Sequence, residues 1–389
     1  MSAAGADAAL EAVLDEPGDD QALLGAAARA TDDLRARSMR LDVERRHLPR
    51  SSPRWEALAL EERELRVLAE ARWGGALDGQ VDRWALRGGL VHAQIGAAAF
   101  LERGARLLDA GVIDVWGLSR VLDGGGSFFD SQLLTRVRAA DLTGNVLGED
   151  GARALSAAPW GPGLRWLKID SAALGDAGVS ALAAAPAFAA LRSLSRADTR
   201  VTANGVAAIA AGFGAVRALT LSANAAGDAG VGALAAAPHL AELRALGLRG
   251  VRAGEAALRS LAAARFAATL RYLDLSRNAP GDAGVAALAA GRFDGLQELD
   301  LSENDLGAAG IAALAGARGL GALRTLGLEG RNEYEAPPVP SLVPLADSPA
   351  LASLALLRVS QYQSSGSGAA SVRGAARDIA CDVTVHQPG

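Results

Sequence analysis

The sequence repeats itself, and this repetition constrains the fold more than any other feature. Aligned segments begin at successive positions whose spacings are 27, 25, 27, 27, 26 and 27 residues. A unit of this length cannot bury its own apolar side, so neighbouring units have to stack and share one continuous core. The period therefore predicts a solenoid over this part of the chain. The segments begin at Leu164, Leu191, Val216, Leu243, Leu270, Leu296 and Leu323.

Each repeat opens with an L-x-x-L-x-L pattern, as in Leu270, Leu273 and Leu275. The period-two ending of this pattern predicts a short strand. An Asn after the strand could turn its amide inward and satisfy backbone groups of adjacent coils. Helices with one buried side are expected next, since apolar residues recur three positions apart, and an Asp before each helix suits an N-cap. The Asn positions are 224, 278 and 304, and the Asp residues are Asp176, Asp228 and Asp282.

This strand-and-helix unit resembles the leucine-rich repeat of the ribonuclease-inhibitor-like type, over roughly residues 112–386. The resemblance implies an α/β solenoid with parallel strands on the concave side and helices on the convex side. We place this domain at residues 111–386, with about eight to ten coils and a Pro-rich insertion at 331–349. Arg196 departs from the pattern because it takes an inward apolar position. Since a buried charge is costly, either the strand slips there or the coil is open on one side.

Residues 1–110 do not repeat, and their apolar spacing is mostly helical. They resemble the repeat-companion domain that precedes many bacterial leucine-rich-repeat arrays. The resemblance implies an all-α N-terminal cap with an adaptor-like role and no known chemistry. A cap would cover the apolar end of the array, and a separate binding role stays open. The matching segments are Leu10–Asp20, Arg37–Leu41, Arg54–Leu58 with Arg63 and Glu64, Trp73, Arg87–Val91, and Phe100 with Leu101.

Composition and motifs give little support to an enzyme. A single cysteine, Cys381, and four scattered histidines predict neither a disulfide framework nor a metal site. The glycines at 124–126 lack the Lys-Ser/Thr of a phosphate loop, and Cys381 near His386 is better explained as a small residue of a closing strand. We therefore expect no enzymatic activity, no cofactor and no metal.

Net charge and hydropathy indicate the kind of partner and the cellular location to expect for this chain. A net charge of −5 does not favour nucleic-acid binding. The first residues lack the apolar core of a signal peptide, and no apolar run approaches the length of a membrane span. The expectation is a cytoplasmic chain without membrane contact.

The outward positions of the short strands are where a partner would bind. They predict an acidic patch beside Tyr272, with Trp166 as a second aromatic at the other end of the array. Such a patch favours a basic protein or peptide. The candidate binding residues are Trp166, Lys168, Asp170, Arg249, Tyr272, Asp274, Glu298, Asp300, Glu303 and Glu329.

The predicted function is a non-enzymatic scaffold that binds a protein or peptide on its concave side. Two alternatives stay open. Some similar repeat proteins activate small GTPases through an exposed Arg or Asn, although nothing in this sequence singles one out. The chain could also be a structural subunit of a larger assembly. The Pro-rich insertion could form a binding loop or a disordered excursion.

Overall fold

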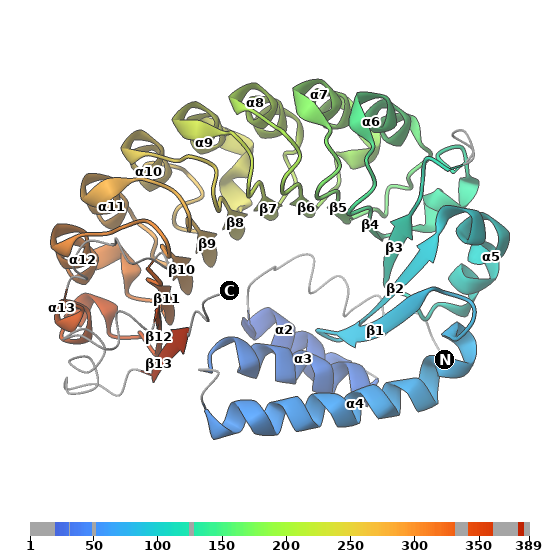
Figure 1. Ribbon diagram of the computed structural model, residues 1–389, viewed down its shortest axis with the longest axis horizontal. Helices are drawn as coiled ribbons and strands as arrows, with labels where there is room; N and C mark the ends of the chain where they lie inside the picture. The colour runs from blue at the N-terminus through green and yellow to red at the C-terminus, as the bar shows by residue number, and fades with distance from the viewer. Residues whose placement is uncertain are drawn as a thin grey trace, which may run out of the picture. The chain divides into compact units, whose positions relative to one another are not determined.

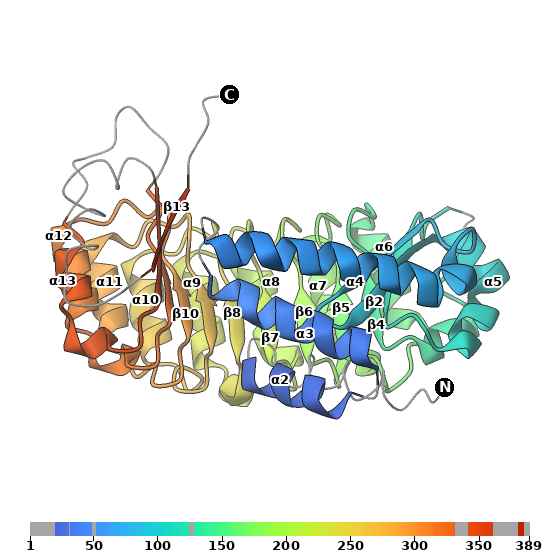
Figure 2. The same ribbon diagram turned by 90° about the horizontal axis from the view of Figure 1, so that it is seen from below.

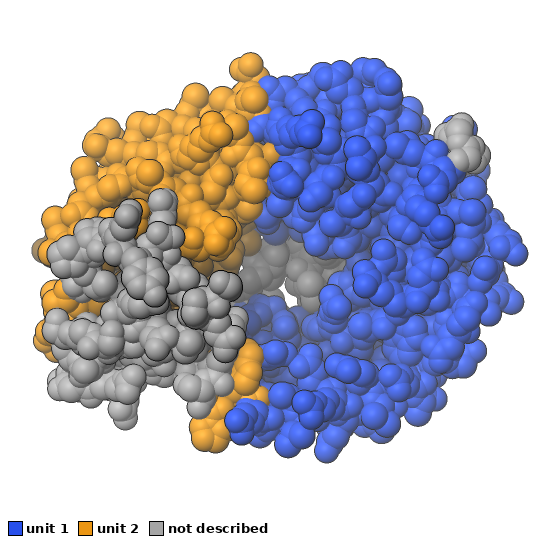
Figure 3. Space-filling view, in the orientation of Figure 1, with its two compact units in different colours: residues 1–46, 56–201, 208–220 blue, residues 47–55, 202–207, 221–389 orange. Residues whose placement is uncertain are grey.

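The computed structural model describes residues 20–30, 32–48, 52–123, 128–330, 341–360 and 380–384. The chain divides into two compact units, coloured separately in Figure 3. Unit 1 comprises residues 1–46, 56–201 and 208–220, and unit 2 comprises residues 47–55, 202–207 and 221–389. The expected division at residue 110 stays a prediction, because these units follow spatial contacts and not the sequence repeat.

Unit 1 contains the N-terminal helices and the first coils of the array. Strands β2 to β7 pair in parallel with their sequence neighbours, and β1 pairs antiparallel with β2. Its elements are α2 (Asp20–Arg29), α3 (Asp33–Arg46), α4 (Pro53–Leu77), β1 (Arg83–Arg87), β2 (Leu90–Gly96), α5 (Ala97–Ala110), β3 (Val115–Ser119), the 3-10 helix η1 (Gln132–Arg136), β4 (Ala139–Asp141), α6 (Gly148–Ala157), β5 (Trp166–Lys168), α7 (Gly175–Ala184), η2 (Pro186–Phe188), β6 (Ser193–Ser195) and β7 (Ala218–Thr220), with α8 (Ala203–Gly212) divided between the units.

Unit 2 continues the same alternation of strand and helix. Its strands β8 to β13 pair in parallel in sequence order. In each unit taken by itself, the strands of the coils lie on the inner side of the bend, and the helices that follow them, α5 to α7 in unit 1 and α9 to α13 in unit 2, lie on the outer side (Figure 1). The elements are α9 (Gly227–Ala236), η3 (Pro238–Glu242), β8 (Ala245–Gly247), α10 (Glu255–Ala262), β9 (Tyr272–Asp274), α11 (Gly281–Ala289), β10 (Glu298–Asp300), α12 (Ala308–Ala315), η4 (Arg318–Leu320), β11 (Thr325–Gly327), α13 (Val343–Ala346), η5 (Pro349–Leu351), β12 (Leu356–Ser360) and β13 (Ala380–Thr384).

The asparagines at the strand ends perform the role expected from the sequence. The Asn278 amide nitrogen donates to the carbonyls of Leu248 and Leu275 at 2.8 and 2.7 Å. Its Oδ1 accepts from the backbone N–H groups of Val251 and Ala253. These backbone groups belong to two adjacent coils, so the buried amide joins the coils with hydrogen bonds that an apolar residue could not make.

The aspartates of the repeat were expected as N-caps of their own helices, and that expectation is wrong. The N-cap positions of α9 and α11 are held by Ala226 and Pro280, without a side-chain cap. Asp228 Oδ1 instead accepts from the N–H of Gly254, the N-cap of the next helix, and Asp282 Oδ1 does the same with Gly307. A Cβ at residue 307 would lie 2.6 Å from the Asp282 carboxylate, so glycine permits this contact between coils.

Arg196 lies in a regular coil, and both explanations expected for it are wrong. Strand β6 keeps its register with β5 and β7, and the Arg196 N–H donates to the Thr220 carbonyl as its counterparts do in other coils. The residue is 0% exposed, so the coil is not open. Burial lowers the pKa of the Arg196 guanidinium to about 9, which reflects the cost of a charge in this position.

The N-terminal region is not all-helical as expected, because it also contains the hairpin formed by β1 and β2. Gly88 and Gly89 connect the strands with φ angles of +52° and +79°, the geometry of a two-residue type I′ turn. A sequence in which Gly-Gly separates two apolar runs is typical of such a turn, a signal that the helical interpretation overlooked. The helix expected at Ala97–Leu108 is confirmed as α5.

Helix α3 is fastened to this hairpin by a buried ion pair. Arg35 pairs with Asp114, and the two side chains are 5% and 4% exposed. Arg35 also donates to the carbonyls of Gly89 and Val112, and Asp114 accepts from the Val91 N–H. These contacts make the N-terminal helices part of the same packed structure as the first strands of unit 1.

Several expected features lie outside the described residues, in whole or in part. These are the first helix near Leu10, the glycines at 124–126, residues 331–340 of the Pro-rich insertion, the closing helix near Ala375, and His386. The closing strand expected at Val383–Val385 corresponds to β13, which ends at Thr384. Among the helices that the structure describes, none is long and apolar enough to cross a membrane.

Candidate partner-binding face

The outward side chains of the strands form the candidate site, and we call this side of each unit its strand face. Leu273 of β9 and Leu275 just after it point inward and are 0% exposed, whereas the outward Tyr272 and Asp274 are partly exposed. The same alternation holds in β10 around Leu299. Because β9 and β10 pair in register, Tyr272 lies beside Glu298 and Asp274 beside Asp300. The expected candidates in these strands are therefore brought together.

Two carboxylates of this face are already engaged by arginines. Glu298 accepts from Arg358 of β12 at 2.8 Å. Glu303 pairs with Arg277 at 2.8 Å and with Arg249 at 3.3 Å. The acidic patch expected from the sequence is thus partly neutralised at both margins, because each of these ion pairs offsets a negative charge.

Asp274 and Asp300 form the acidic centre of the face, and we call them the aspartate pair. Asp274 Oδ1 accepts from the Ser276 N–H at 2.9 Å and from its hydroxyl at 2.6 Å. Asp300 Oδ1 accepts from the Ser302 N–H at 2.9 Å. These bonds fix one oxygen of each carboxylate and orient the side chains on the face.

The surroundings of Asp274 disfavour its ionised form. Burial is the largest cause that raises its pKa above the ordinary value, and the neighbouring Asp300 carboxylate raises it further. The hydrogen bonds from Ser276 and the charge of Arg249 act in the opposite direction. A cation placed against the aspartate pair would relieve this repulsion.

Tyr272 was expected to be exposed, and it is instead half-buried. Burial raises the pKa of its phenol, and the carboxylates of Asp274, Glu298 and Asp300 raise it further. The phenol therefore stays neutral at physiological pH and can donate a hydrogen bond. Glu329, two residues after β11, is also half-buried, and its N–H donates to the Ser302 hydroxyl at 3.1 Å.

In unit 1 the strand face is occupied differently, and Trp166 is not the open anchor that the sequence suggested. Trp166 is half-buried and packs against an apolar cluster contributed by strands and by α2 and α3. Met39 of α3 and Ala139 of β4, both in this cluster, are 0% exposed. Figures 1 and 2 show α2, α3 and α4 side by side. The other cluster members are Leu23, Ala26, Ala27, Ala36, Val43, Leu90 and Val115.

Lys168 and Asp170 follow Trp166 along this face. The Lys168 ammonium lies 3.5 Å from Asp170 and 3.9 Å from Asp141. Asp170 also accepts from the Ser195 hydroxyl and from the Ala197 N–H, both at 2.8 Å. The two candidates therefore hold each other and the neighbouring strand, which satisfies much of their charge within unit 1.

A small cavity of about 250 Å³ lies beside Trp166, with His92 and Arg87 in its lining. Burial lowers the pKa of His92 to about 4, and the charge of Arg87 adds to this effect. The imidazole is consequently neutral at physiological pH. In the described ranges, no group of His, Cys, Asp and Glu residues is arranged to hold a metal ion.

Arg277 and Arg358 are functional neighbours that the sequence analysis did not include. Arg358 occupies the same register position in β12 as Gly327 in β11. The pattern around Leu357 and Val359 already placed residue 358 outward, so its charge could have been counted. Arg277 lies after β9, beyond the period-two positions, and nothing in that pattern indicated its contact with Glu303.

Comparison with known proteins agrees with this architecture. Residues 267–289 and 296–315 match the family model for the leucine-rich repeat. These residues contain β9 with α11 and β10 with α12, two successive coils of unit 2. The repeat geometry and the matched coils identify an α/β solenoid of the leucine-rich-repeat kind. No curated protein matches the sequence significantly.

Several solved structures are similar to part of the chain. The structure of the TLR13–ssRNA13 complex shares 16% identity over 64% of this chain and 40% of that chain, with a TM-score of 0.38. Internalin InlF from Listeria monocytogenes shares 17% over 64% and 68%, and the Rad7–Elc1 complex of yeast shares 15% over 68% and 82%, each with a TM-score of 0.38. This chain thus spans 40% of the TLR13 chain.

Proposed function

We propose that this leucine-rich-repeat chain is a non-enzymatic scaffold whose strand face in unit 2 binds a protein or peptide through basic side chains. The observation that carries the proposal is the aspartate pair. Asp274 and Asp300 lie side by side in register, and serine hydrogen bonds orient them. A ready-made, oriented anionic site of this kind favours a guanidinium or ammonium group from a partner.

The surroundings of the aspartate pair support a macromolecular partner. Tyr272 offers an aromatic surface and a hydroxyl group next to the carboxylates, a combination common at the centre of protein interfaces. The ion pair of Glu298 with Arg358 and the pairs of Glu303 surround the centre with opposite charges. Such a rim favours a partner with a matching charge pattern over any free cation.

The finer features belong to the same proposal. The repeats are of the ribonuclease-inhibitor-like type, and the N-terminal region is a repeat-companion domain of the bacterial kind that acts as a cap. In unit 2, the half-buried side chains of Arg249 and Glu329 support the strand face, and the aspartate pair with Tyr272 makes the main contact. Trp166, Lys168 and Asp170 shape the strand face of unit 1. The chain acts in the cytoplasm and needs no cofactor.

The proposal is tested by removing the two charges and keeping the shape. The Asp274→Asn, Asp300→Asn double variant retains the Oδ1 acceptors for the serine donors. Affinity capture from cells of the source organism, with wild type and this variant as bait, identifies partners that need the charges. Each candidate is then purified, and we expect its Kd to rise at least about tenfold for the variant, the equivalent of about 1.4 kcal/mol.

Asp294→Asn provides the matched control, because Asp294 is an exposed carboxylate that pairs with Arg292 outside the strands. This change removes the same kind of charge and should leave the Kd unaltered. A partner that binds wild type, the control and the double variant with one affinity would contradict the proposal. All variants are first compared with wild type in circular dichroism and melting temperature.

A further inference from the structure

Strand β1 leaves one of its edges free. It pairs with β2 on one side, and within the described part of the chain no strand pairs with it on the other. In a two-residue hairpin the residues that flank the turn are hydrogen-bonded to each other, and every second residue repeats this arrangement. Arg87, Ala85 and Arg83 therefore bond to β2. The N–H and C=O groups of Trp84 and Leu86 consequently point to the free edge.

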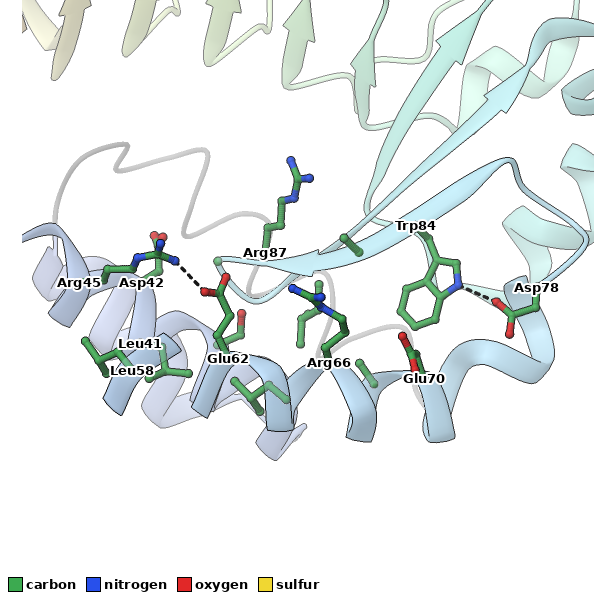
Figure 4. Close-up of a pocket in the computed structure, with 16 residues that line it drawn as sticks. Leu41, Asp42, Arg45, Leu58, Glu62, Arg66, Glu70, Asp78, Trp84 and Arg87 are labelled. Carbon is green, nitrogen blue, oxygen red and sulfur yellow. Dashed lines mark hydrogen bonds and ion pairs between the residues drawn. The ribbon is translucent and has the colours of Figure 1, made fainter. Parts of the chain in front are cut away.

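A groove of about 760 Å³ runs along this edge, between β1 and the helices α3 and α4 (Figure 4). Its lining includes the apolar side chains of Leu58, Leu65 and Ala69 from α4, which are almost fully buried. Leu86 and Trp84 contribute from the strand. The groove thus combines unpaired main-chain groups of a strand with an apolar floor.

The charges of the groove are unequally satisfied. Glu62 accepts from Arg45 at 2.7 Å, and Asp78 accepts from the Trp84 indole at 3.0 Å, so these carboxylates have partners (Figure 4). Arg66 and Arg87 make no ion pair with any residue that the structure describes. Both guanidiniums are exposed, and both belong to residues that line the groove.

We propose that this groove binds an extended peptide segment of a partner as an additional strand on β1, with alternating apolar and acidic side chains. An extended chain running alongside matches the spacing of the free main-chain groups of Trp84 and Leu86 and can pair with both residues. Side chains of such a chain alternate between two sides. The apolar set lies on the side of Leu86 and packs against the apolar residues of α4, and the acidic set lies on the side of Arg87.

This site is separate from the strand face of unit 2. All of its lining residues belong to unit 1, between Ser38 and Gly88. It also favours the opposite charge, since Arg66 on α4 and Arg87 on the other side of β1 have no ion pair among the described residues, whereas the aspartate pair presents carboxylates (Figure 4). The inference therefore does not depend on the function proposed above.

The experiment measures binding of a fluorescein-labelled heptapeptide, in which valine and glutamate alternate, to the full chain by fluorescence anisotropy. Backbone N-methylation of alternate residues tests the strand geometry, because only every second N–H of an added strand faces β1. We expect methylation of one alternate set to abolish binding and methylation of the other set to leave the Kd nearly unchanged. The same composition with valines and glutamates in separate blocks should not bind.

Two variants locate the site on the chain. Leu86→Pro removes an N–H that points to the free edge and none that bonds to β2, so we expect loss of binding in a folded protein. Leu86→Ala keeps the N–H and separates the effect of the side chain. Arg87→Glu should weaken binding about fivefold, and Arg63→Glu, an exposed position of α4 outside the groove, should not.

The proposal is overturned by no measurable binding of the alternating peptide, or by equal effects of the two N-methylated sets. Unchanged affinity in a folded Leu86→Pro variant would also overturn it, because the peptide would then bind elsewhere. Circular dichroism establishes folding of each variant, and the methylated peptides test the geometry on the wild-type chain even where a variant fails to fold.

Discussion

The strand faces of the two units use equivalent positions of the same repeat for opposite purposes. In unit 1, Ala139 of β4 is fully buried, and Trp166 of β5 packs in the apolar cluster that includes residues of α2 and α3. In unit 2, the corresponding first positions of β9 and β10 are Tyr272 and Glu298, which lie beside the aspartate pair. The face of unit 1 is covered there by the chain's own helices, whereas in unit 2 the charged positions of β9 and β10 stay partly exposed, although the outward Thr325 of β11 is fully buried.

Inward and outward positions of the repeat therefore carry separate information. The inward leucines, such as Leu167 in unit 1 and Leu273 in unit 2, are almost fully buried in both and build the same coil. The outward positions are free to vary because they do not contribute to the shared core. The apolar Trp166 thus lies on a face that the chain's own helices cover, and the charged Asp274 and Asp300 lie on a face that another molecule can reach.

The largest expected effect comes from breaking the attachment of α3 in unit 1. Arg35→Ala leaves Asp114 as a buried carboxylate without its guanidinium, which typically costs about 3–5 kcal/mol of unfolding free energy. Urea denaturation followed by circular dichroism measures this loss. The matched control is Arg37→Ala on the same helix, whose pair with Glu64 is exposed and 4.0 Å long, with an expected change within about 0.5 kcal/mol. Similar losses for both variants would show that the ion pair does not fasten the helix.

The second prediction places one substitution at equivalent positions of the two faces. Ala139→Asp buries a carboxylate in the apolar cluster and should destabilise the chain by about 3 kcal/mol or more. Ala245→Asp, at the half-buried first position of β8 in unit 2, should cost less than about 1 kcal/mol. Melting temperatures of the two variants provide the comparison. If Ala245→Asp were as damaging as Ala139→Asp, the face of unit 2 would be as closed as that of unit 1.

The repeat made most of the solenoid predictable. Strand positions, the inward amide of Asn278 and the helical stretches follow from a period that is repeated many times, so errors in one coil are corrected by the others. The roles of Asp228 and Asp282 were misassigned because a local pattern cannot distinguish a cap of the same helix from a cap of the next. The hairpin of β1 and β2 occurs once, without that redundancy, and its Gly-Gly turn was overlooked.

The candidate site was only partly predictable, for a related reason. Alternation placed Asp274 and Asp300 on one face correctly, because register in stacked coils follows the repeat. Alternation could not show that Arg358 in β12 lies against Glu298 in β10, since that contact depends on how far the side chains reach across the strands. The covering of Trp166 depends on how non-repeating helices pack, which no period describes.

The smallest expected effect tests whether the open face sacrifices stability for binding. The raised pKa of Asp274 means that the native state holds its proton more tightly than the unfolded chain, so stability falls as pH rises through that pKa. Asp274→Asn mimics the neutral form and keeps the Oδ1 acceptor for Ser276. We expect a gain of about 0.5–1 kcal/mol at neutral pH that disappears below the ordinary aspartate pKa of about 3.9. Urea denaturation at both pH values measures it, with Asp294→Asn as the exposed control. A lower free energy of unfolding for Asp274→Asn at neutral pH would mean that the ionised carboxylate stabilises the coil through Ser276 and Arg249. The charges of the unit 2 face would then serve the stability of the chain, as the apolar residues of the unit 1 face do.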